Sequence, residues 1–469
     1  MKRIAIIGGG IAGLSAAYYL EKMHRNGADL EWVLLEKSAR LGGVIATEQL
    51  DGFVLEAGPD SFLSIKPGGA RLCQELGLGD QLISSNDAGR KTYILVKNRL
   101  VPIPQGLEFM VPTRIWPMAT TPLFSFATKL RMATEWLTSN NKNTTDESVG
   151  SFVRRHFGQE MVDRVAEPLL SGVYGGDVEN LSVRAVLPRF AEMERESGSL
   201  VRATLQAKAH ARSTAKPGIK PPPLFTSLKN GMQQLVDALI SALPKGPVKM
   251  QQQDLTVRPF GGDWQVESSG GTENFQAVIL AVPAPAAAGL LRQLHPTLTK
   301  SLSSIQYTSS SAVALAYTQA DLPDGHGFLV PRSEGRKIMA CTFVHKKFPH
   351  RAPGDAKLLR CFFSSSRIPE LLTYSDSDLE KIAREELQEI LGLSSEPLFG
   401  RSFRWDRAMA QYEVGHLERV AEMEKIITAT PGLHIIGNSF HGIGLPDCIK
   451  SARLAVEKIT ADVSHAAPV

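Results

Sequence analysis

The chain has 469 residues, which is long for one hydrophobic core and predicts two or three domains. Its 43% hydrophobic and 21% charged residues exclude a disordered chain, and a formal charge of +4 argues against a general nucleic-acid binder. The four cysteines are far apart and form no Cys/His cluster, so we expect reduced thiols, a cytoplasmic setting and no metal.

The first elements form a nucleotide-binding pattern. The sequence predicts a strand over 2–7, a helix over 14–23 and a second strand over 30–36. The loop after the first strand has the G-x-G-x-x-G spacing and consists of Gly8, Gly9, Gly10, Ile11, Ala12 and Gly13. Gly8 permits a tight turn, Gly10 lets the backbone approach a pyrophosphate, and Gly13 lets the helix pack on the strand. Glu36 ends the second strand, where a carboxylate accepts hydrogen bonds from a ribose, so we predict a bound dinucleotide.

Two further glycine boxes follow Glu36. The first contains Lys37, Arg40, Gly42, Gly43 and Val44, and the second contains Gly58, Pro59, Asp60 and Ser61. Both resemble segments of the amine-oxidase-like FAD superfamily. The resemblance implies that the first box lies along the pyrophosphate and ribityl chain of FAD and that the second passes beside the flavin ring. A plain NAD dehydrogenase does not need the first of these boxes, and Gly58-Pro59 taken alone would suit a surface turn.

The segment 107–137 is rich in Met and aromatic residues, with basic residues interleaved. One interpretation is a helical surface that rests on a membrane or lines an entry path for an apolar substrate. The other is a helical core, because such a stripe at helical spacing often packs inward. No run of about 20 apolar residues exists, so we expect no transmembrane helix.

The stretch Glu167–Asp177 reads EPLLSGVYGGD. It resembles the oxygen-dependent protoporphyrinogen/coproporphyrinogen oxidases of haem biosynthesis, and the similarity continues over 181–200 and 405–416. The resemblance implies a noncovalent FAD that takes hydrogens from a porphyrinogen and passes electrons to O2, giving H2O2. The flavin N5 is then the hydride acceptor, and we expect no catalytic side chain.

The segment 201–229 holds six Lys or Arg residues and no acid, and it includes a Pro-rich run. This composition predicts a flexible or extended connector. A patch that attracts anionic lipid or a carboxylate-rich substrate is the alternative.

The last flavin box lies near the C-terminal end. A predicted strand over 433–437 leads into a loop and a helix that begins near 445 and continues to 458. The expected cofactor contacts there are Gly437, Asn438, Ile443, Gly444 and Leu445, and the FAD domain is therefore assembled from both chain ends. Two contacts are expected from the resemblance elsewhere, at Leu255 on a returning strand and at Trp405.

The substrate residues are predicted from the propionates and pyrroles of a porphyrinogen. Cationic anchors suit propionates, and aromatic rings stack on pyrroles. The candidates are Lys66, Lys91, Gly172, Gly175, Phe362 and Phe363. Whether the substrate is coproporphyrinogen or protoporphyrinogen stays open.

The predicted architecture is α/β and α+β, with a Rossmann-like FAD domain, a substrate domain with a mixed sheet and a mostly helical lobe. The predicted bounds are 1–64, 225–284 and 410–469 for the FAD domain, 65–100 and 285–409 for the substrate domain, 101–200 for the lobe and 201–224 for the connector. The expected partners are a porphyrinogen and O2, without nucleic acid. A peripheral contact with the inner face of the cell membrane, a contact with the next haem-pathway enzyme, and a monomer or homodimer stay open. The rival functions are another flavin oxidase, acting on an amine or carotene, and a non-enzymatic relative that binds prenylated proteins.

Overall fold

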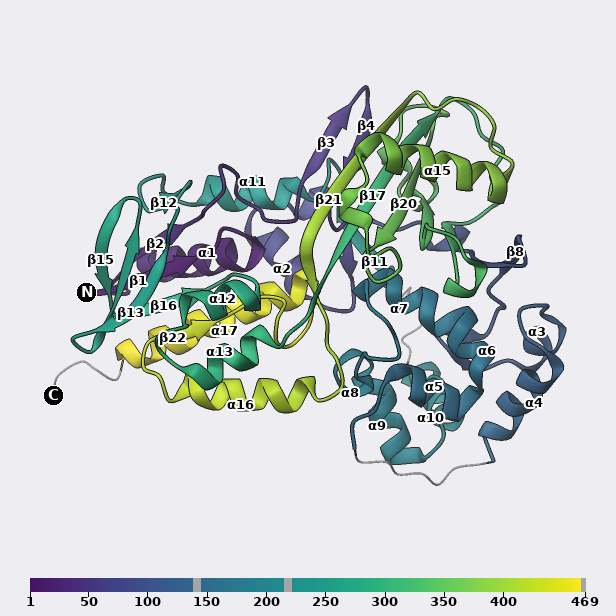
Figure 1. Cartoon of the computed structure of the whole chain (residues 1–469), viewed down its shortest axis with the longest axis horizontal. Coiled ribbons are helices and arrows are strands. Elements are labelled where there is room, and N and C mark those ends of the chain that lie inside the picture. The colour runs from purple at the N-terminus through teal and green to yellow at the C-terminus, as the bar shows by residue number, and fades with distance from the viewer. Residues whose placement is uncertain (138–144, 215–221, 465–469) are drawn as a thin grey trace. The chain divides into compact units, whose positions relative to one another are not determined.

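The computed structural model describes residues 1–137, 145–214 and 222–464. The chain forms two units (Figure 1). The first contains Met1–Ser85, Pro223–Gln306 and Leu417–Val469, and the second contains Asn86–Pro222 and Tyr307–His416. The prediction that both chain ends build one α/β unit is confirmed. In this division the helices of 101–200 share a unit with the strands of 307–416, and the finer division into lobe and substrate domain stays a prediction.

A parallel five-stranded sheet is the frame of the first unit. Its order is β12 (Val248–Lys249), β2 (Leu30–Leu35), β1 (Lys2–Ile7), β16 (Ala277–Leu280) and β22 (Leu433–Ile435). Strands buried on both faces need apolar residues at nearly every position. This explains the runs Ile4–Ile7 and Ala277–Leu280, which are buried throughout.

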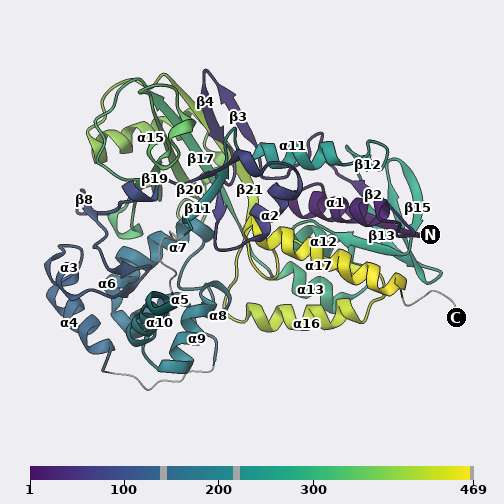
Figure 2. The same ribbon diagram turned by 180° about the vertical axis from the view of Figure 1, so that it is seen from behind.

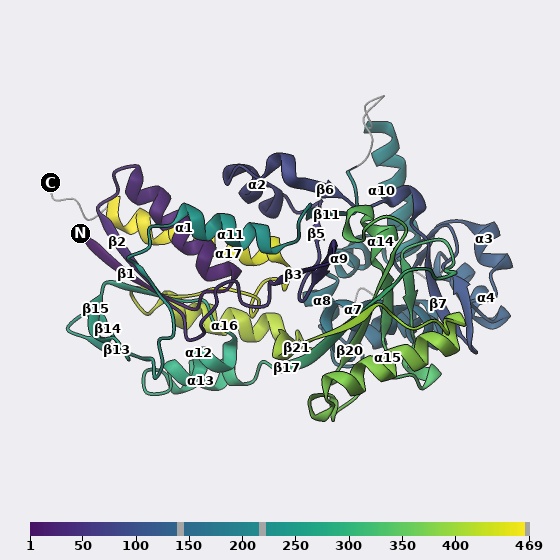
Figure 3. The same cartoon turned by 90° about the horizontal axis from the view of Figure 1, so that it is seen from above.

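Three helices cover one face of this sheet and enclose its core (Figure 3). They are α1 (Ile11–Arg25), α11 (Gln233–Ala242) and α17 (Leu445–Ser464). Ile4 and Ile6 of β1 pack with Leu14, Leu235 and Ile449 of these helices. The strands β13 (Thr256–Phe260), β14 (Asp263–Ser268) and β15 (Gly271–Phe275) form an antiparallel sheet, in which β15 contacts β1 and β14 contacts β16. The remaining elements of the first unit are α2 (Gly68–Glu75), β3 (Thr47–Leu50), β4 (Phe53–Glu56), β5 (Phe62–Leu63), β6 (Leu82–Ser84), β11 (Phe225–Leu228), α12 (Ala284–Leu290), α13 (Pro296–Ser303) and α16 (His416–Thr428) from Leu417 onward.

The second unit contains a seven-stranded mixed sheet. Its order is β21 (Phe399–Ala410), β17 (Tyr307–Tyr317), β20 (Lys357–Ser364), β19 (Ala340–Phe343), β18 (Gly327–Leu329), β7 (Thr92–Val96) and β8 (Arg99–Pro102). The helix α15 (Asp376–Leu391) packs on it with a core that includes Val313, Cys361, Leu379 and Leu387. Ser375 caps the start of α15, and Gly392, in the left-handed conformation, ends it.

Several helices and one small hairpin also belong to the second unit, and α3 to α10 are labelled in Figure 2. They are β9 (Leu107–Glu108), β10 (Val111–Pro112), α3 (Ile115–Thr120), α4 (Phe126–Glu135), α5 (Val149–Phe157), α6 (Gln159–Met161), a π-helical turn (Val162–Ala166), α7 (Glu167–Tyr174), α8 (Val183–Val186), α9 (Pro188–Ser197), α10 (Leu200–Thr214) and α14 (Val344–Lys347). Met118 and Met132 of the segment 107–137 are buried as in a helical core, whereas Ile115, Trp116 and Phe126 are exposed, and the membrane or entry-path interpretation stays a prediction.

The prediction of an extended connector is wrong for its first part. Residues 201–214 belong to α10, which has Leu200, Val201 and Ala203 buried, so an apolar face outweighs the basic composition there. The Pro-rich run mostly lies in 215–221, outside the described residues. The apolar pattern of 248–257 predicts one strand, but the structure has two, β12 and β13. Gln251 and Asp254 have positive φ angles of 57° and 52°, which end an extended segment.

Candidate functional site

The three glycines of the first loop have different surroundings. A Cβ on Gly13 would lie 1.8 Å from the Gly8 carbonyl oxygen, and one on Gly8 would lie 2.5 Å from the Ala281 carbonyl oxygen. These two glycines therefore let the loop, α1 and β16 pack closely. A Cβ on Gly10 would meet no atom within 4 Å. Gly10 thus leaves space on the side of the loop that is open to a ligand.

The start of α1 suits a negatively charged group. Gly10 caps the helix without a side-chain hydrogen bond, and the first turn has no acidic residue. The first intrahelical bond runs from the Leu14 N–H to the Gly10 carbonyl, so the preceding N–H groups at Ile11, Ala12 and Gly13 remain available to a ligand. Such N–H groups and the positive end of the helix dipole bind phosphates.

Glu36 joins the end of β2 to the glycine loop. Its Oε2 accepts a hydrogen bond from the Gly9 N–H at 2.6 Å, and its Oε1 accepts from the Ser38 N–H and Oγ, both at 2.8 Å. A carboxylate has about four acceptor positions, so Glu36 can also accept a ribose hydroxyl. The Gln252 N–H donates to the Glu36 carbonyl, so the segment before β13 runs beside this site. Leu255 follows three residues later in the loop, and its contact with an adenine stays a prediction.

The glycine box that contains Gly42 and Gly43 packs against the glycine loop 8–13. The Gly42 N–H donates to the Gly9 carbonyl at 2.8 Å, and a Cβ on Gly43 would lie 3.2 Å from the Gly10 Cα. Arg40 donates to the carbonyls of Leu41, Gly43 and Ile45. Its guanidinium therefore holds the loop 41–45 in shape. Contacts of Arg40, Lys37 and Val44 with FAD stay predictions.

The box that begins at Gly58 contacts the preceding box, which ends at Val44. A Cβ on Gly58 would lie 1.9 Å from the Val44 carbonyl oxygen, so no larger residue fits. Asp60 accepts a hydrogen bond from Ser61 Oγ at 2.6 Å, and its carbonyl accepts from Ser227 Oγ at 2.6 Å. These contacts hold the segment from Gly58 through Pro59 to Ser61 on the first unit.

The C-terminal box lies in the same unit as the other three. Gly437 has a φ of 119° and no atom within 4 Å of a built Cβ, so it also leaves open space. Asn438, Ile443 and Gly444 form the loop that leads into α17 at Leu445. Burial raises the pKa of the Cys448 thiol to about 12, and a protonated buried thiol is a poor nucleophile.

Lys66 already has a partner in the first unit. Its Nζ lies 2.6 and 2.8 Å from the two carboxylate oxygens of Asp447, in the first turn of α17. Asp447 was missed by sequence reasoning, although an acidic residue in a first turn is a recognisable signal. Lys91 lies in the second unit, 4.0 Å from Asp324, and both are exposed. The anchoring of propionates by Lys66 and Lys91 stays a prediction.

The other predicted substrate residues belong to the second unit. Gly172 lies on α7 with open space around it, and Gly175 ends that helix in the left-handed conformation. Phe363 is fully buried in the core beneath α15, so its ring is not available for stacking and we correct that prediction. Phe362 points to the opposite face of β20, where the Arg360 guanidinium lies 4.8 Å from its ring centroid. Trp405 is a half-buried residue of β21, and its contact with a cofactor stays a prediction.

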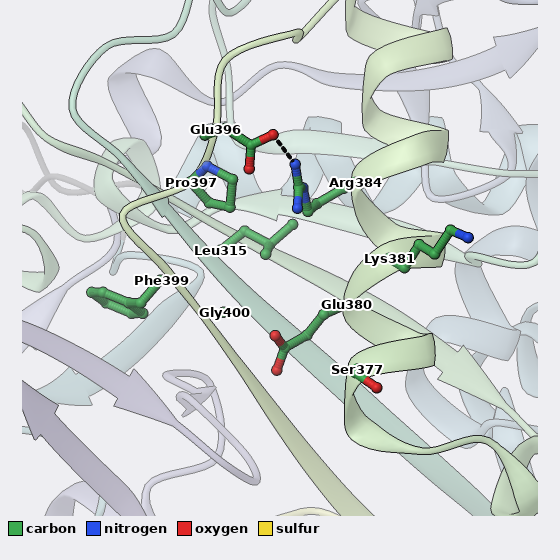
Figure 4. A pocket seen from close by; sticks show the side chains of 9 residues that line it. All are labelled: Leu315, Ser377, Glu380, Lys381, Arg384, Glu396, Pro397, Phe399 and Gly400. Carbon is green, nitrogen blue, oxygen red and sulfur yellow. Dashed lines mark hydrogen bonds and ion pairs between the residues drawn. The ribbon is translucent and has the colours of Figure 1, made fainter.

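Figure 4 shows a pocket in the second unit that involves none of these residues. It lies between α15 and the strands β17 and β21, where Arg384 pairs with Glu396. Glu380 points into it from α15, and burial raises the pKa of this carboxyl. The pocket thus contributes nothing to the predicted site.

A buried ionic cluster connects three helices of the second unit, α4, α5 and α9. His156 Nδ1 lies 2.9 Å from Glu135 Oε1, and His156 Nε2 lies 3.1 Å from Glu194 Oε1. Arg155 pairs with Glu194 and Glu147. Burial alone would lower the pKa of His156, but the hydrogen bonds to Glu135 and Glu194 raise it above its ordinary value. The two carboxylates therefore favour the protonated form of His156.

The described residues contain neither a group of metal ligands nor a membrane-spanning helix. Within 1–137, 145–214 and 222–464, no three His, Cys, Asp or Glu side chains are grouped so that they could hold a metal ion. In the same ranges, no helix combines the length and apolar character that crossing a bilayer requires.

Comparisons with known proteins agree with the glycine boxes. The family model for flavin containing amine oxidoreductase matches residues 11–460. Coproporphyrinogen III oxidase of Bacillus subtilis (strain 168) is 36% identical over 97% of this chain and 97% of its own length. A solved structure from Exiguobacterium sp. 255-15, provisionally named protoporphyrinogen oxidase, is 31% identical with a TM-score of 0.86, covering 98% of this chain and 99% of that one. Cyclohexylamine oxidase from Brevibacterium oxydans, at 15% identity and a TM-score of 0.70 over 99% of both chains, shares the fold. The predicted resemblance is confirmed.

Proposed function

We propose that this chain, which belongs to the flavin containing amine oxidoreductase family, is a FAD-dependent oxidase of a porphyrinogen in haem biosynthesis. Family membership makes the chain a flavoenzyme. The observation that carries the proposal is a glycine cradle, open at Gly10, in a chain that is similar along its whole length to a coproporphyrinogen III oxidase. We take coproporphyrinogen III as the first substrate to test, with protoporphyrinogen IX as the second.

The residues of the cradle fit a noncovalent FAD. The N–H groups at the start of α1 would bind the pyrophosphate, and Glu36 would accept hydrogen bonds from the adenine ribose. Gly437 offers open space at the C-terminal box. The raised pKa of Cys448 argues against a thioether to this cysteine.

The reaction requires little acid or base catalysis from the protein. A bound FAD supplies a two-electron oxidation, with O2 as the proposed acceptor and H2O2 as the product. Two pyrroles stabilise positive charge at each methylene bridge of the substrate, so no strong base is needed. Six hydrogens leave in total, which requires repeated rounds. The side chains must orient the macrocycle and exclude water, and Lys66 and Lys91 are the proposed partners of the propionates.

Exposed apolar residues support a peripheral membrane contact as a further part of the proposal. Ile115, Trp116 and Phe126 are 89%, 77% and 82% exposed on α3 and α4, and Arg114 is exposed beside them. Aromatic residues next to basic ones suit the interface of an anionic bilayer. Co-sedimentation with anionic vesicles tests this, and equal sedimentation of the wild type and Trp116→Ser would contradict it.

The decisive assay follows porphyrin fluorescence. Purified protein with added FAD should convert coproporphyrinogen III to coproporphyrin III in air, and much more slowly without O2. The rate must exceed that of heat-inactivated protein, since porphyrinogens autoxidise. Equal rates would refute the proposal. Peroxide formed with an amine and not with either porphyrinogen would favour an amine oxidase instead.

A further inference from the structure

The helix α7 is held at its N-terminal end by a buried ion pair and a backbone hydrogen bond. Glu167 Oε1 accepts a hydrogen bond from Arg367 Nη2 at 3.1 Å, and Glu167 Oε2 accepts from the Arg332 N–H at 3.1 Å. Arg367 also donates to the carbonyls of Val330 and Ile338, beside β18 and β19. A π-helical turn precedes α7, and such turns often occur at functional sites.

Two side chains, one at the end of β20 and one directly after β21, hold the C-terminal end of α7. Ser364 Oγ, at the end of β20, donates to the Gly175 carbonyl at 2.7 Å. Gln411 Nε2, directly after β21, donates to the Tyr174 carbonyl at 2.7 Å. The last carbonyls of a helix lack intrahelical partners and usually face water. Here buried donors from distant parts of the chain satisfy them.

Close contacts also restrict this turn. A Cβ on Gly175 would lie 3.0 Å from Thr308 Oγ1, and a Cβ on Gly176 would lie 1.8 Å from Gln411 Oε1. The left-handed φ of 63° at Gly175 favours glycine, and a side chain at Gly176 would displace the Gln411 amide. Ser364 and Gln411 therefore satisfy the carbonyls of this turn and also fix its position.

The outer face of α7 is exposed to solvent at Gly172 and Val173, about one helical turn before the Tyr174–Gly176 turn. Gly172 is exposed with no atom within 4 Å of a built Cβ, and Val173 is 54% exposed. A helix that is fixed at both ends and bare between them is a rigid platform. Rigid elements hold a ligand more accurately than loops do.

We propose that Ser364 and Gln411 are positioning residues that fix the turn Tyr174–Gly176 and thereby hold the open face at Gly172 against the porphyrinogen. This inference rests on the proposed function. Neither side chain needs to touch the substrate. Their loss should raise KM by letting the platform move, while the chemical step and FAD binding remain.

The test compares Ser364→Ala, Ser364→Cys and Gln411→Leu with the wild type. Each lost hydrogen bond should raise KM for coproporphyrinogen III about 3- to 10-fold, with kcat within about twofold and the flavin spectrum unchanged. Ser364→Cys keeps a weak donor and should give an intermediate KM. Ser311→Ala is the matched control, because Ser311 is a buried β17 serine whose hydroxyl has no hydrogen-bond partner among the described residues.

A second readout does not depend on turnover. Hydrogen exchange of the amides at 172–176 should accelerate in Ser364→Ala and Gln411→Leu and stay unchanged in Ser311→Ala. A lower Tm with unchanged KM would mean a merely structural role and would overturn the inference. Unchanged exchange would overturn it as well. A wild type that oxidises no porphyrinogen would overturn the proposed function and this inference together, whereas active variants with wild-type KM would overturn the inference alone.

Discussion

Gly10 offers the sharpest separation between folding and cofactor binding. It has φ of −71° and ψ of −177°, which any L-residue can adopt, and a Cβ there meets nothing within 4 Å. Gly10→Val should therefore change the stability of the apoprotein by no more than about 1 kcal/mol, mainly through a poorer helix cap. The added side chain occupies the space proposed for the pyrophosphate. Loss of two or three charge-assisted hydrogen bonds, at about 1.5–3 kcal/mol each, weakens FAD binding at least about 100-fold.

Gly13→Ala is the matched comparison. Its Cβ would lie 1.8 Å from the Gly8 carbonyl oxygen, a backbone atom that no rotamer change can move away. This variant should lose folding together with flavin. The assay measures circular dichroism and Tm of both apoproteins and titrates FAD calorimetrically. A folded Gly10→Val protein that binds FAD like the wild type would refute our placement of the phosphates, and an unfolded one would refute the open space at Gly10.

Three other predictions follow from the site and the ionic cluster. Glu36→Gln should keep the fold and weaken FAD binding about 10-fold, since a carboxylate forms stronger hydrogen bonds than an amide; calorimetric affinity equal to the wild type would contradict the ribose contact. The pKa of His156 in the folded state is raised above its ordinary 6.5, so the stability that this histidine contributes is complete below pH 6.5 and is lost as pH rises through the folded-state pKa. A plot of Tm against pH should show this fall in the wild type and not in His156→Gln. Identical profiles would count against the contacts of His156 with Glu135 and Glu194. Lys66→Ala should raise KM for coproporphyrinogen III several-fold with little change in kcat, and an unchanged KM would remove Lys66 from the substrate site.

The first unit was largely predictable because the sequence signals for its elements are local. The run from β1 through Gly13 to Glu36 places turn, helix and acid within a short stretch of chain, and the structure keeps that order. The start of α17 near Leu445 was equally readable. Glycine spacing specifies backbone geometry directly, so no distant partner is needed to interpret it.

Long-range partners explain what the sequence could not provide. Phe362 and Phe363 are adjacent, and only the position of α15 decides which ring is buried, because both faces of β20 carry apolar residues. The pairing of Lys66 with Asp447 joins residues far apart in the chain. The basic composition of α10 masks the few apolar positions that bury it. In each case tertiary packing decides whether a side chain is buried and which partner it has, and composition alone does not.

The sheet order of the first unit has a consequence for biosynthesis. The strand β22 and helix α17 come from residues after 417, so a ribosome must synthesise the entire second unit before β16 gains its last neighbour. Until then the nascent chain exposes an unpaired edge and an uncovered apolar face, features that invite aggregation. Stable capture of flavin should therefore follow synthesis of α17, and a chain truncated before β22 should emerge without its chromophore.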